Sequence, residues 1–195
     1  KSMVENEKGQ NLDSSFVVFD LETTGFGPVN DQIIEIGAVK VINGKIVDQY
    51  STFVNPDVPI PFEIEKLTGI NDQMVMDYPM IDQILPEFLA FCEGCILVAH
   101  NASFDVGFIN KKAEFMGIKT DFTVIDTVSM ARSLLPELNR FKLNVVAKAL
   151  GISLENHHRA VDDAKATAEI FMKFITMLKE KDVLTLEQLN HFGQS

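Results

Sequence analysis

The sequence predicts an α/β fold in which a mixed five-stranded sheet is flanked by helices. Two observations lead to this prediction. Near the start of the chain, Asn43-Gly44 separates two strand-like segments, and this dipeptide is a strong signal for a tight hairpin turn. Further along, short apolar segments alternate with amphipathic ones, which is typical of strands connected by helices. An antiparallel meander followed by parallel strands accounts for both observations.

The first predicted strand, at residues 16–22, is a short apolar run rich in valine and phenylalanine. It forms the meander with a second strand at residues 32–42 and with a third at residues 45–54, which returns after the Asn43-Gly44 turn. The other two, at residues 95–100 and 122–126, each follow a helical segment. This order predicts that the last two strands lie parallel to a strand of the meander.

The predicted helices show apolar residues at helical spacing. They span residues 62–68, 80–92, 103–116 and 159–181, with several short helices up to residue 151. Gly69 and Gly117 directly follow two of these segments, and glycine readily adopts the left-handed conformation that ends a helix. The segment 159–181 has the clearest helical pattern of the chain.

Composition excludes several classes of protein. The chain has 195 residues, of which 46% are hydrophobic and 23% charged, an ordinary balance for a folded domain. Its 17 basic and 28 acidic residues give a net charge of −11, which argues against a protein that coats nucleic acid non-specifically. We find neither a membrane-spanning apolar run nor a secretion signal, so we expect a cytoplasmic protein with no membrane partner.

Residues 1–15 are polar and show no periodicity. We expect them to be a disordered leader, or an end left by excision from a longer protein, and residues 16–195 to form a single domain. Cys92 and Cys95 form a lone C-x-x-C pair, and a zinc site would need two more ligands. We therefore expect ordinary, partly buried thiols.

Four carboxylates occupy positions that the hydrophobic pattern assigns to the interior. Asp20 and Glu22 lie two residues apart at the end of a strand, so both point to the same side. Asp105 is at the head of the apolar stripe of its helix, and Asp163 lies on the apolar face of the last helix, whereas Asp162 faces water. Purely structural interpretations remain open: a frayed strand end for the pair, and stabilisation of the helix dipole by Asp105.

Together these acids favour a cation site. Ligation by oxygen alone suits Mg²⁺ or Mn²⁺ rather than zinc. Two such ions about 3.5–4 Å apart can stabilise the attacking and leaving oxygens in phosphodiester cleavage. His158 precedes Asp163 by five residues, and an imidazole of near-neutral pKa can accept a proton from the attacking water. His100, His157 and His191 are expected to be merely packed or solvated.

Three segments resemble the motifs of the DEDDh 3′→5′ exonucleases. They are FDLETTG at 19–25, AHNASFDVGFI at 99–109 and HHRAVDDA at 157–164. The likeness is greatest to the proofreading exonuclease domains of PolC-type bacterial DNA polymerase III, and IIEIGAVK at 33–40 also resembles them. The resemblance covers about residues 16–178 and implies a ribonuclease-H-like fold.

The resemblance also implies a catalytic set and a reaction. By position in the motifs, the metal ligands are Asp20, Glu22, Asp105 and Asp163. The general base is His158, which has the H-x₄-D spacing to Asp163, whereas His157 does not. The implied cofactors are two divalent cations, Mg²⁺ or Mn²⁺. One would activate water with His158 accepting its proton, and the other, near Asp20, would stabilise the leaving 3′ oxygen. The product would be a nucleoside 5′-monophosphate.

The same resemblance implies a pocket for the 3′-terminal nucleotide. Its candidate residues are Thr23, Thr24, Gly25, Asn101, Phe104, Ile60 and Leu67. The implied partners are the 3′ end of single-stranded or frayed DNA and the remainder of a replicative polymerase, in the same chain or complex. Six basic residues between positions 130 and 165 either steer the DNA backbone or belong to an ordinary solvated surface.

Three alternatives remain open from the sequence. An exoribonuclease of the same fold would use the same motifs, because recognition of the 2′-hydroxyl depends on details of the groove. A non-catalytic nucleic-acid or metal-binding module with a decayed site is less favoured, since all five polar positions are present. The first strand also superficially resembles that of haloacid-dehalogenase-type phosphatases, but Glu22 stands where those enzymes need a second aspartate, and a hairpin follows instead of a helix.

Overall fold

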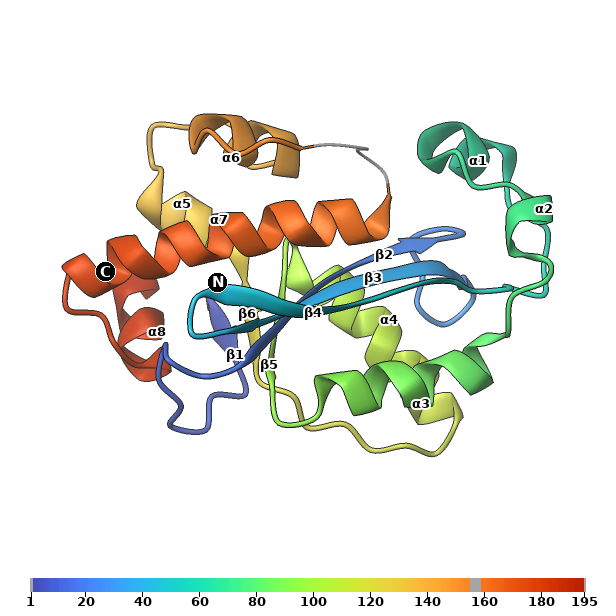
Figure 1. Ribbon diagram of the computed structural model, residues 1–195, viewed down its shortest axis with the longest axis horizontal. Coiled ribbons are helices and arrows are strands. Elements are labelled where there is room, and N and C mark those ends of the chain that lie inside the picture. Colours follow the sequence, from blue (N-terminus) through green and yellow to red (C-terminus); the bar gives the residue numbers. More distant parts are fainter. Residues whose placement is uncertain (1, 155–158, 195) are drawn as a thin grey trace.

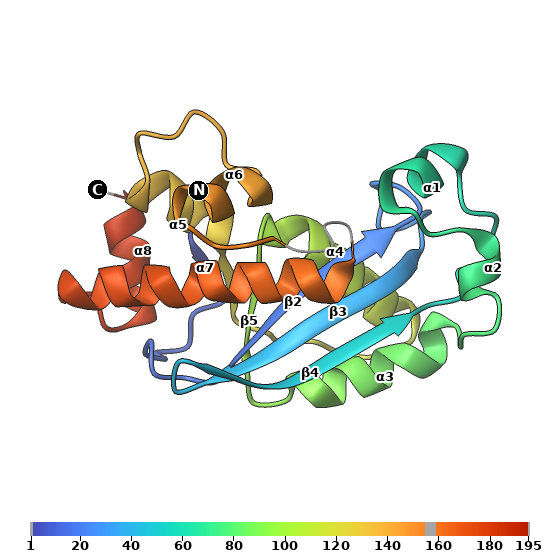
Figure 2. The ribbon, with the colours of Figure 1, turned by 45° about the horizontal axis from the view of Figure 1, so that its top comes forward.

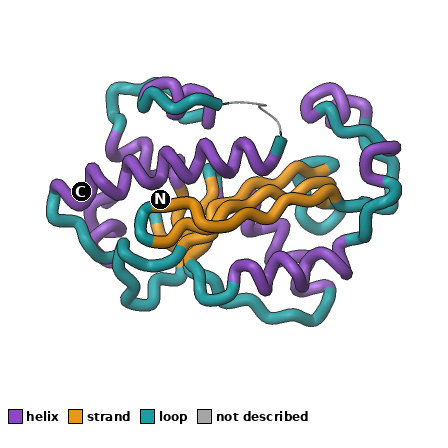
Figure 3. Tube along the Cα trace, viewed as in Figure 1, coloured by secondary structure: helices purple, strands orange, loops and turns teal. Residues whose placement is uncertain are grey.

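The computed structural model describes residues 2–154 and 159–194. Its strands form one mixed sheet in the order β1-β6-β5-β2-β3-β4, and helices cover both faces (Figures 1 and 3). The strands are β1 (Val4–Glu5), β2 (Phe16–Thr23), β3 (Ile33–Ile42), β4 (Lys45–Phe53), β5 (Ile96–Ala99) and β6 (Val124–Asp126). The helices are α1 (Phe62–Thr68), α2 (Asp72–Val75), α3 (Ile81–Cys92), α4 (Ala102–Phe115), α5 (Thr127–Leu134), α6 (Leu143–Ala149), α7 (Ala160–Glu180) and α8 (Leu186–Gln194).

The predicted meander and the parallel strands are confirmed. β2 pairs antiparallel with β3, and β3 with β4, whereas β2–β5 and β5–β6 are parallel. Asn43 and Gly44 have φ angles of 53° and 73°, as required of a two-residue turn with both central residues left-handed. Asparagine and glycine tolerate this conformation, which explains why the hairpin could be predicted from the sequence.

Alternate residues of β2 face two separate layers of helices. Phe16 packs edge-to-face on Phe171 of α7, with ring centroids 4.8 Å apart, in a core that also contains residues of α5, α6 and α8. Phe19 faces the opposite layer and packs on Phe88 of α3, with centroids 5.5 Å apart. Figure 2 shows α7 on one side of the sheet and α3 and α4 on the other. β2 is therefore fixed from both faces.

The N-terminal segment differs from the expectation of a disordered leader. Val4 pairs antiparallel with Ile125 of β6, and its backbone N–H and C=O both bond the side chain of Asn190 in α8. Met3 and Leu12 are also buried. The prediction of disorder was wrong because a two-residue strand has no periodicity, and its burial depends on residues at the far end of the chain. β1 thereby makes the sheet six-stranded.

The end of the sheet at which β2 finishes is where the first turn of α7 lies, and α1 and α2 lie beyond it (Figures 1 and 2). In the part of the chain that the structure describes, no helix combines the length and the apolar character needed to cross a lipid bilayer.

Candidate active site

Asp20 and Glu22 lie at the end of β2 on the face that carries α7. Val18, two residues earlier, is part of the core on that face, so the alternation of the strand directs both acids to the same side. In the sheet register, Asp20 is opposite Gly37 and Glu22 is opposite Glu35 of β3. The register shifts between Glu22 and Thr23, where the chain leaves regular pairing.

Asp163 in the first turn of α7 meets this pair. Carboxylate oxygens of Asp20, Glu22 and Asp163 lie within 4.8 Å of one another, close enough to share an ion. Asp163 is buried, as its helical periodicity predicts. Its neighbour Asp162 is half-buried and does not belong to this group of three.

Asp105, in the first turn of α4, approaches from the other layer. It is 4% exposed, and its carboxylate accepts a hydrogen bond from the backbone N–H of Leu21 in β2. Of the nearby charges, Asp105 contributes most to the raised pKa of Asp20. The structure therefore brings together the four acids that the sequence places inward, three in direct proximity and the fourth immediately behind them.

The electrostatics of this cluster are unfavourable without a cation. Desolvation raises the pKa of Asp20 well above its usual value, and the charges of Asp105, Glu22 and Asp163 raise it further. Desolvation, followed by the charge of Asp163, raises the pKa of Glu22 to about 8. Among the described residues, no group lowers either pKa. An all-oxygen donor set in which neighbouring carboxylates raise the pKa values of Asp20 and Glu22 fits Mg²⁺ or Mn²⁺.

A fifth acid, Glu35, was not singled out from the sequence. It is fully buried on β3 and accepts hydrogen bonds of 3.0 Å from Nε of Arg159 and from the backbone N–H of Ala160. The available signal was a charged residue within the apolar run of residues 33–39, on the same strand face as Gly37 and Val39.

The segment after the first two acids is held by Asp31. Thr24 Oγ1 accepts a hydrogen bond from the backbone N–H of Gln32 and lies 3.4 Å from the Asp31 carboxylate. A Cβ on Gly25 would lie 2.5 Å from that carboxylate, so any other residue there would have to displace the Asp31 side chain. Lys112 Nζ donates to the Asp31 carbonyl from α4 at 2.6 Å. Thr23 bonds the Gly25 carbonyl, so this segment has a defined shape.

The other pocket candidates are in different environments. Phe104 is partly buried, and its ring contacts Phe26, which is 83% exposed and was not predicted from the sequence. Asn101 is exposed at the start of α4, and Leu67 is exposed on α1. Ile60, in contrast, is buried in a small core whose other buried members are Ile34, Ile70 and Val75. Ile60 therefore offers little surface to a nucleotide.

The remaining predictions divide into tested and untested ones. His158 and His157 lie outside the described residues. His100 is packed, as expected, because its ring nitrogens bond Thr127 Oγ1 and the Phe141 carbonyl, and burial lowers its pKa. His191 is exposed. Cys92 is buried and Cys95 half-buried, both as free thiols, as predicted.

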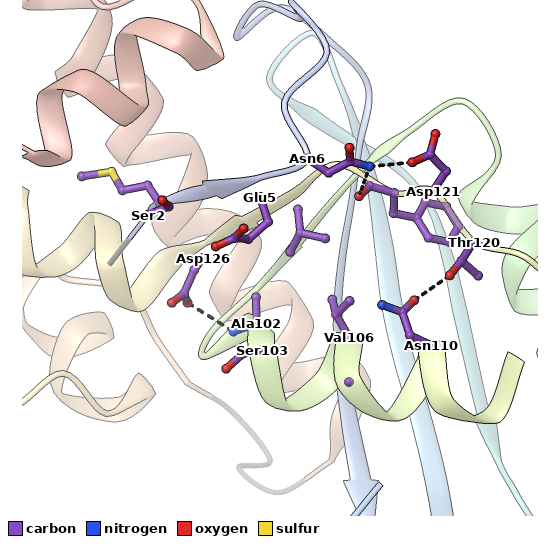
Figure 4. A pocket seen from close by; sticks show the side chains of 14 residues that line it. Ser2, Glu5, Asn6, Ala102, Ser103, Val106, Asn110, Thr120, Asp121 and Asp126 are labelled. Carbon is purple, nitrogen blue, oxygen red and sulfur yellow. Dashed lines mark hydrogen bonds between the residues drawn. The ribbon is translucent and has the colours of Figure 1, made fainter. Parts of the chain in front are cut away.

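A pocket of about 410 Å³ adjoins α4 but is separate from the acid cluster (Figure 4). It is lined by β1, by residues of α4 other than Asp105, and by the segment leading into β6. Its polar side chains largely bond one another: Asn6 donates to Asp121, and Thr120 to Asn110. Asp126 accepts from the backbone N–H groups of Asn101 and Ala102. The raised pKa values of Asp20 and Glu22 mark the acid cluster, and not this pocket, as the candidate site.

Fold and site together define a class: α/β enzymes that cleave phosphodiester bonds at clustered carboxylates. The model of the Exonuclease family of RNase T type matches residues 17–171. The chain belongs to this family, and it is a DEDDh 3′→5′ exonuclease related to the exonuclease region of PolC-type polymerases. The resemblance recognised in the sequence is thereby confirmed.

Two polymerases that resemble this chain are much longer than it is. It is 50% identical over 188 residues to the DNA polymerase III PolC-type of Caldanaerobacter subterraneus subsp. tengcongensis, and 55% identical over 189 residues to that of Clostridium perfringens. Each match covers 96% of this chain but only 13% of the relative.

Solved structures match over most of the chain. Exonuclease X in complex with 5′ overhanging duplex DNA has a TM-score of 0.71 and 29% identity, and the match covers 91% of this chain and 99% of that one. The nuclease domain of 3′hExo, a DEDDh family member bound to rAMP, has a TM-score of 0.74 at 19% identity, covering 89% and 96%. The latter supports the fold alone, which is the predicted ribonuclease-H-like fold.

Proposed function

We propose that this chain removes nucleotides from the 3′ end of single-stranded or frayed DNA, and that it proofreads new DNA as part of a PolC-type polymerase. The observation that carries the proposal is the convergence of Asp20, Glu22 and Asp163, whose carboxylate oxygens lie within 4.8 Å of one another, with Asp105 close enough for its charge to raise the pKa of Asp20. About half of the aligned residues are identical to those of each of two PolC-type polymerases. The product is a nucleoside 5′-monophosphate.

We assign two divalent cations, Mg²⁺ or Mn²⁺, to the four acids. When bound, these ions supply positive charge to the attacking and leaving oxygens of the scissile phosphodiester. Asp20 experiences the charges of all three other acids, and we assign it to the side of the leaving 3′ oxygen. His158 is the proposed base that accepts the proton of the attacking water, on the H-x₄-D spacing to Asp163.

The pocket for the terminal nucleotide is assigned to the segment that Asp31 holds. Thr23, Thr24 and Gly25 have a defined shape directly beside Glu22, which suits them to fix a terminal nucleotide relative to the acids. The exposed Phe26 ring, supported edge-on by Phe104, offers an aromatic face on which a base can stack. Asn101 and Leu67 remain candidates at the rim. An unpaired end is preferred, since mismatched bases separate at lower free-energy cost.

The acidic net charge suits a module attached to a polymerase. A protein of charge −11 is repelled by DNA at long range, so its own affinity for a DNA end is expected to be weak. Attachment to a polymerase that already holds the primer replaces this affinity by a high effective concentration of the 3′ end. Low affinity of the isolated chain is therefore part of the proposal.

The test is a digestion of 5′-labelled primers by the isolated chain with Mg²⁺ or Mn²⁺. We expect stepwise shortening from the 3′ end, release of nucleoside monophosphates, and faster digestion of a mismatched than of a matched primer. Asp20→Ala is expected to reduce the rate at least about 10²–10³-fold, the scale of losing one transition-state-stabilising group. Equal rates for both proteins would favour a non-catalytic module, and faster digestion of an RNA primer would favour an exoribonuclease.

A further inference from the structure

The buried carboxylate of Glu35 takes no part in the proposed chemistry, yet it lies opposite Glu22 in the sheet. Removing a carboxylate from water is unfavourable unless hydrogen bonds replace its hydration. Glu35 has two such bonds, from Nε of Arg159 and from the backbone N–H of Ala160, both of 3.0 Å. We call these three residues the Glu35 clamp.

Both donors of the clamp belong to the start of α7. Ala160 is the first residue of the helix, and Arg159 occupies the capping position, where its own side chain makes no capping hydrogen bond. The first backbone N–H groups of a helix have no partner within the helix, and negative charge is favourable beside them. A strand residue distant in sequence therefore provides the cap that α7 lacks locally.

Gly37 allows the same turn of α7 to contact β3 directly. A Cβ on Gly37 would lie 2.1 Å from the backbone nitrogen of Val161, and 2.2 Å from the carbonyl carbon of Ala160. Glu35 and Gly37 are two residues apart and so lie on the same face of the strand. One residue holds the first turn of α7 through hydrogen bonds, and the other permits backbone contact.

Asp163 is rigidly connected to this clamped turn. Its backbone N–H bonds the Arg159 carbonyl at 3.0 Å, within one helical turn of the residues that Glu35 holds. Gly37 is opposite Asp20 and Glu35 is opposite Glu22, so the clamp is adjacent to the two acids that Asp163 meets. The guanidinium group of Arg159 also lies 5.0 Å from the ring of Phe53 on β4, which fixes the outer side of the clamp.

We propose that Glu35 is a positioning residue that sets the distance between Asp163 and the Asp20–Glu22 pair, and thereby the affinity of the site for divalent cations. This inference rests on the proposed function, because it assigns a role to a residue next to the proposed cation ligands. Glu35 acts through α7 and touches neither substrate nor cation.

The test measures Mn²⁺ binding by calorimetry, without substrate, for the wild type and for Glu35→Ala and Glu35→Gln. Groups that orient metal ligands typically contribute 10- to 100-fold to affinity, so Glu35→Ala is expected to weaken Mn²⁺ binding about 10- to 100-fold. Glu35→Gln keeps one acceptor oxygen, so its Mn²⁺ affinity is expected to lie between those of the wild type and Glu35→Ala. The exonuclease activity of Glu35→Ala should be largely restored at saturating Mn²⁺, since the ligands themselves remain.

Val39→Ala is the matched control. Val39 is buried on the same face of β3 and belongs to the same core as α7, but it makes no hydrogen bond to the start of the helix. This variant is expected to lower the Tm while leaving Mn²⁺ affinity unchanged. Asp20→Ala gives the Mn²⁺ affinity expected when one of the proposed cation ligands is removed.

The outcomes separate this inference from the proposed function. Unchanged Mn²⁺ affinity in folded Glu35→Ala overturns the positioning role, even if the wild type digests primers. If Glu35→Ala does not fold, unchanged affinity in Glu35→Gln overturns it. A wild type that binds Mn²⁺ without digesting any primer contradicts the proposed function. In that case, the Mn²⁺ affinities of the Glu35 variants still test whether Glu35 positions Asp163.

Discussion

Glu22 and Glu35 are cross-strand partners, but the groups that surround their carboxylates differ. Glu35 is fully buried, and burial raises its pKa, but the hydrogen bonds from the backbone of Ala160 and from Arg159 oppose this rise. Glu22 is half-buried beside Asp163, and its pKa rises to about 8. A buried acid whose charge is compensated by the chain builds the fold, whereas an acid crowded by other acids marks a place for an external cation.

Neutralising one member of the acid cluster is expected to have the largest effect. Asp20→Asn should reduce exonuclease activity by at least about 10²–10³-fold. Without cations, at pH 8, the same variant should unfold at the same or a higher urea concentration than the wild type, because it removes repulsion from a site where desolvation already disfavours charge. Paired activity assays and urea titrations in EDTA test this. A clear loss of cation-free stability would mean that Asp20 is structural, like Glu35.

The comparison also predicts how the stability of the cation-free protein depends on pH. The pKa of Glu22 is about 8 in the folded protein, against an ordinary value of 4.5, so the folded state binds more protons than the unfolded state between these values. Stability should therefore fall as pH rises from about 4.5 to about 8.

Urea unfolding in EDTA at several pH values measures this slope. Glu22→Gln should make it shallower, because a glutamine does not titrate. A slope that is the same in Glu22→Gln and in the wild type would exclude Glu22 as its source.

Cation binding should stabilise the wild type. A ligand present at 100 times its Kd adds about 2.7 kcal/mol to the free energy of unfolding. The Tm of the wild type should rise on adding Mg²⁺ or Mn²⁺ and return to its starting value in excess EDTA. Asp20→Asn should show a much smaller rise at the same concentrations. Equal shifts in both proteins would place the stabilising ion elsewhere.

The contact between β3 and the start of α7, beside Glu35, is tested by substituting Gly37. Gly37→Ala inserts a methyl group against the backbone of Val161 and Ala160, and overpacking of this kind typically destabilises by about 1–3 kcal/mol. Gly107→Ala is the control, because its Cβ would meet nothing within 4 Å and it lies inside α4. That change should be neutral or stabilising, by up to about 1 kcal/mol. Chemical denaturation measures the stability of both variants. Equal stabilities would contradict the close contact between Gly37 and the start of α7.

Much of the site was predictable because it follows from local periodicity. The two-residue repeat of a strand directs Asp20 and Glu22 to one side, and the helical repeat distinguishes Asp163 from Asp162. The hairpin at Asn43-Gly44 is equally local, since its backbone conformation depends on those two residues. Each of these predictions uses only residues that are neighbours in sequence.

The prediction of a disordered N-terminal segment failed because its structure depends on partners from elsewhere in the chain. Val4 becomes a strand residue because Ile125 and Asn190 lie beside it, and nothing in its own segment indicates this. The burial of Ile60 in a small core that includes Ile34 likewise depends on a distant segment.

The sequence alone was enough to predict that the four acids of the motifs face inward, where the meander turns, and to which family the motifs point. The three-dimensional arrangement was needed to show that Glu35 receives two hydrogen bonds that oppose the effect of its burial, whereas the neighbours of Glu22 raise its pKa further. The physical reason is that the direction of a side chain follows from the repeat of its own strand or helix. Compensation of its charge depends on which donors a distant segment, here the start of α7, brings within hydrogen-bond distance.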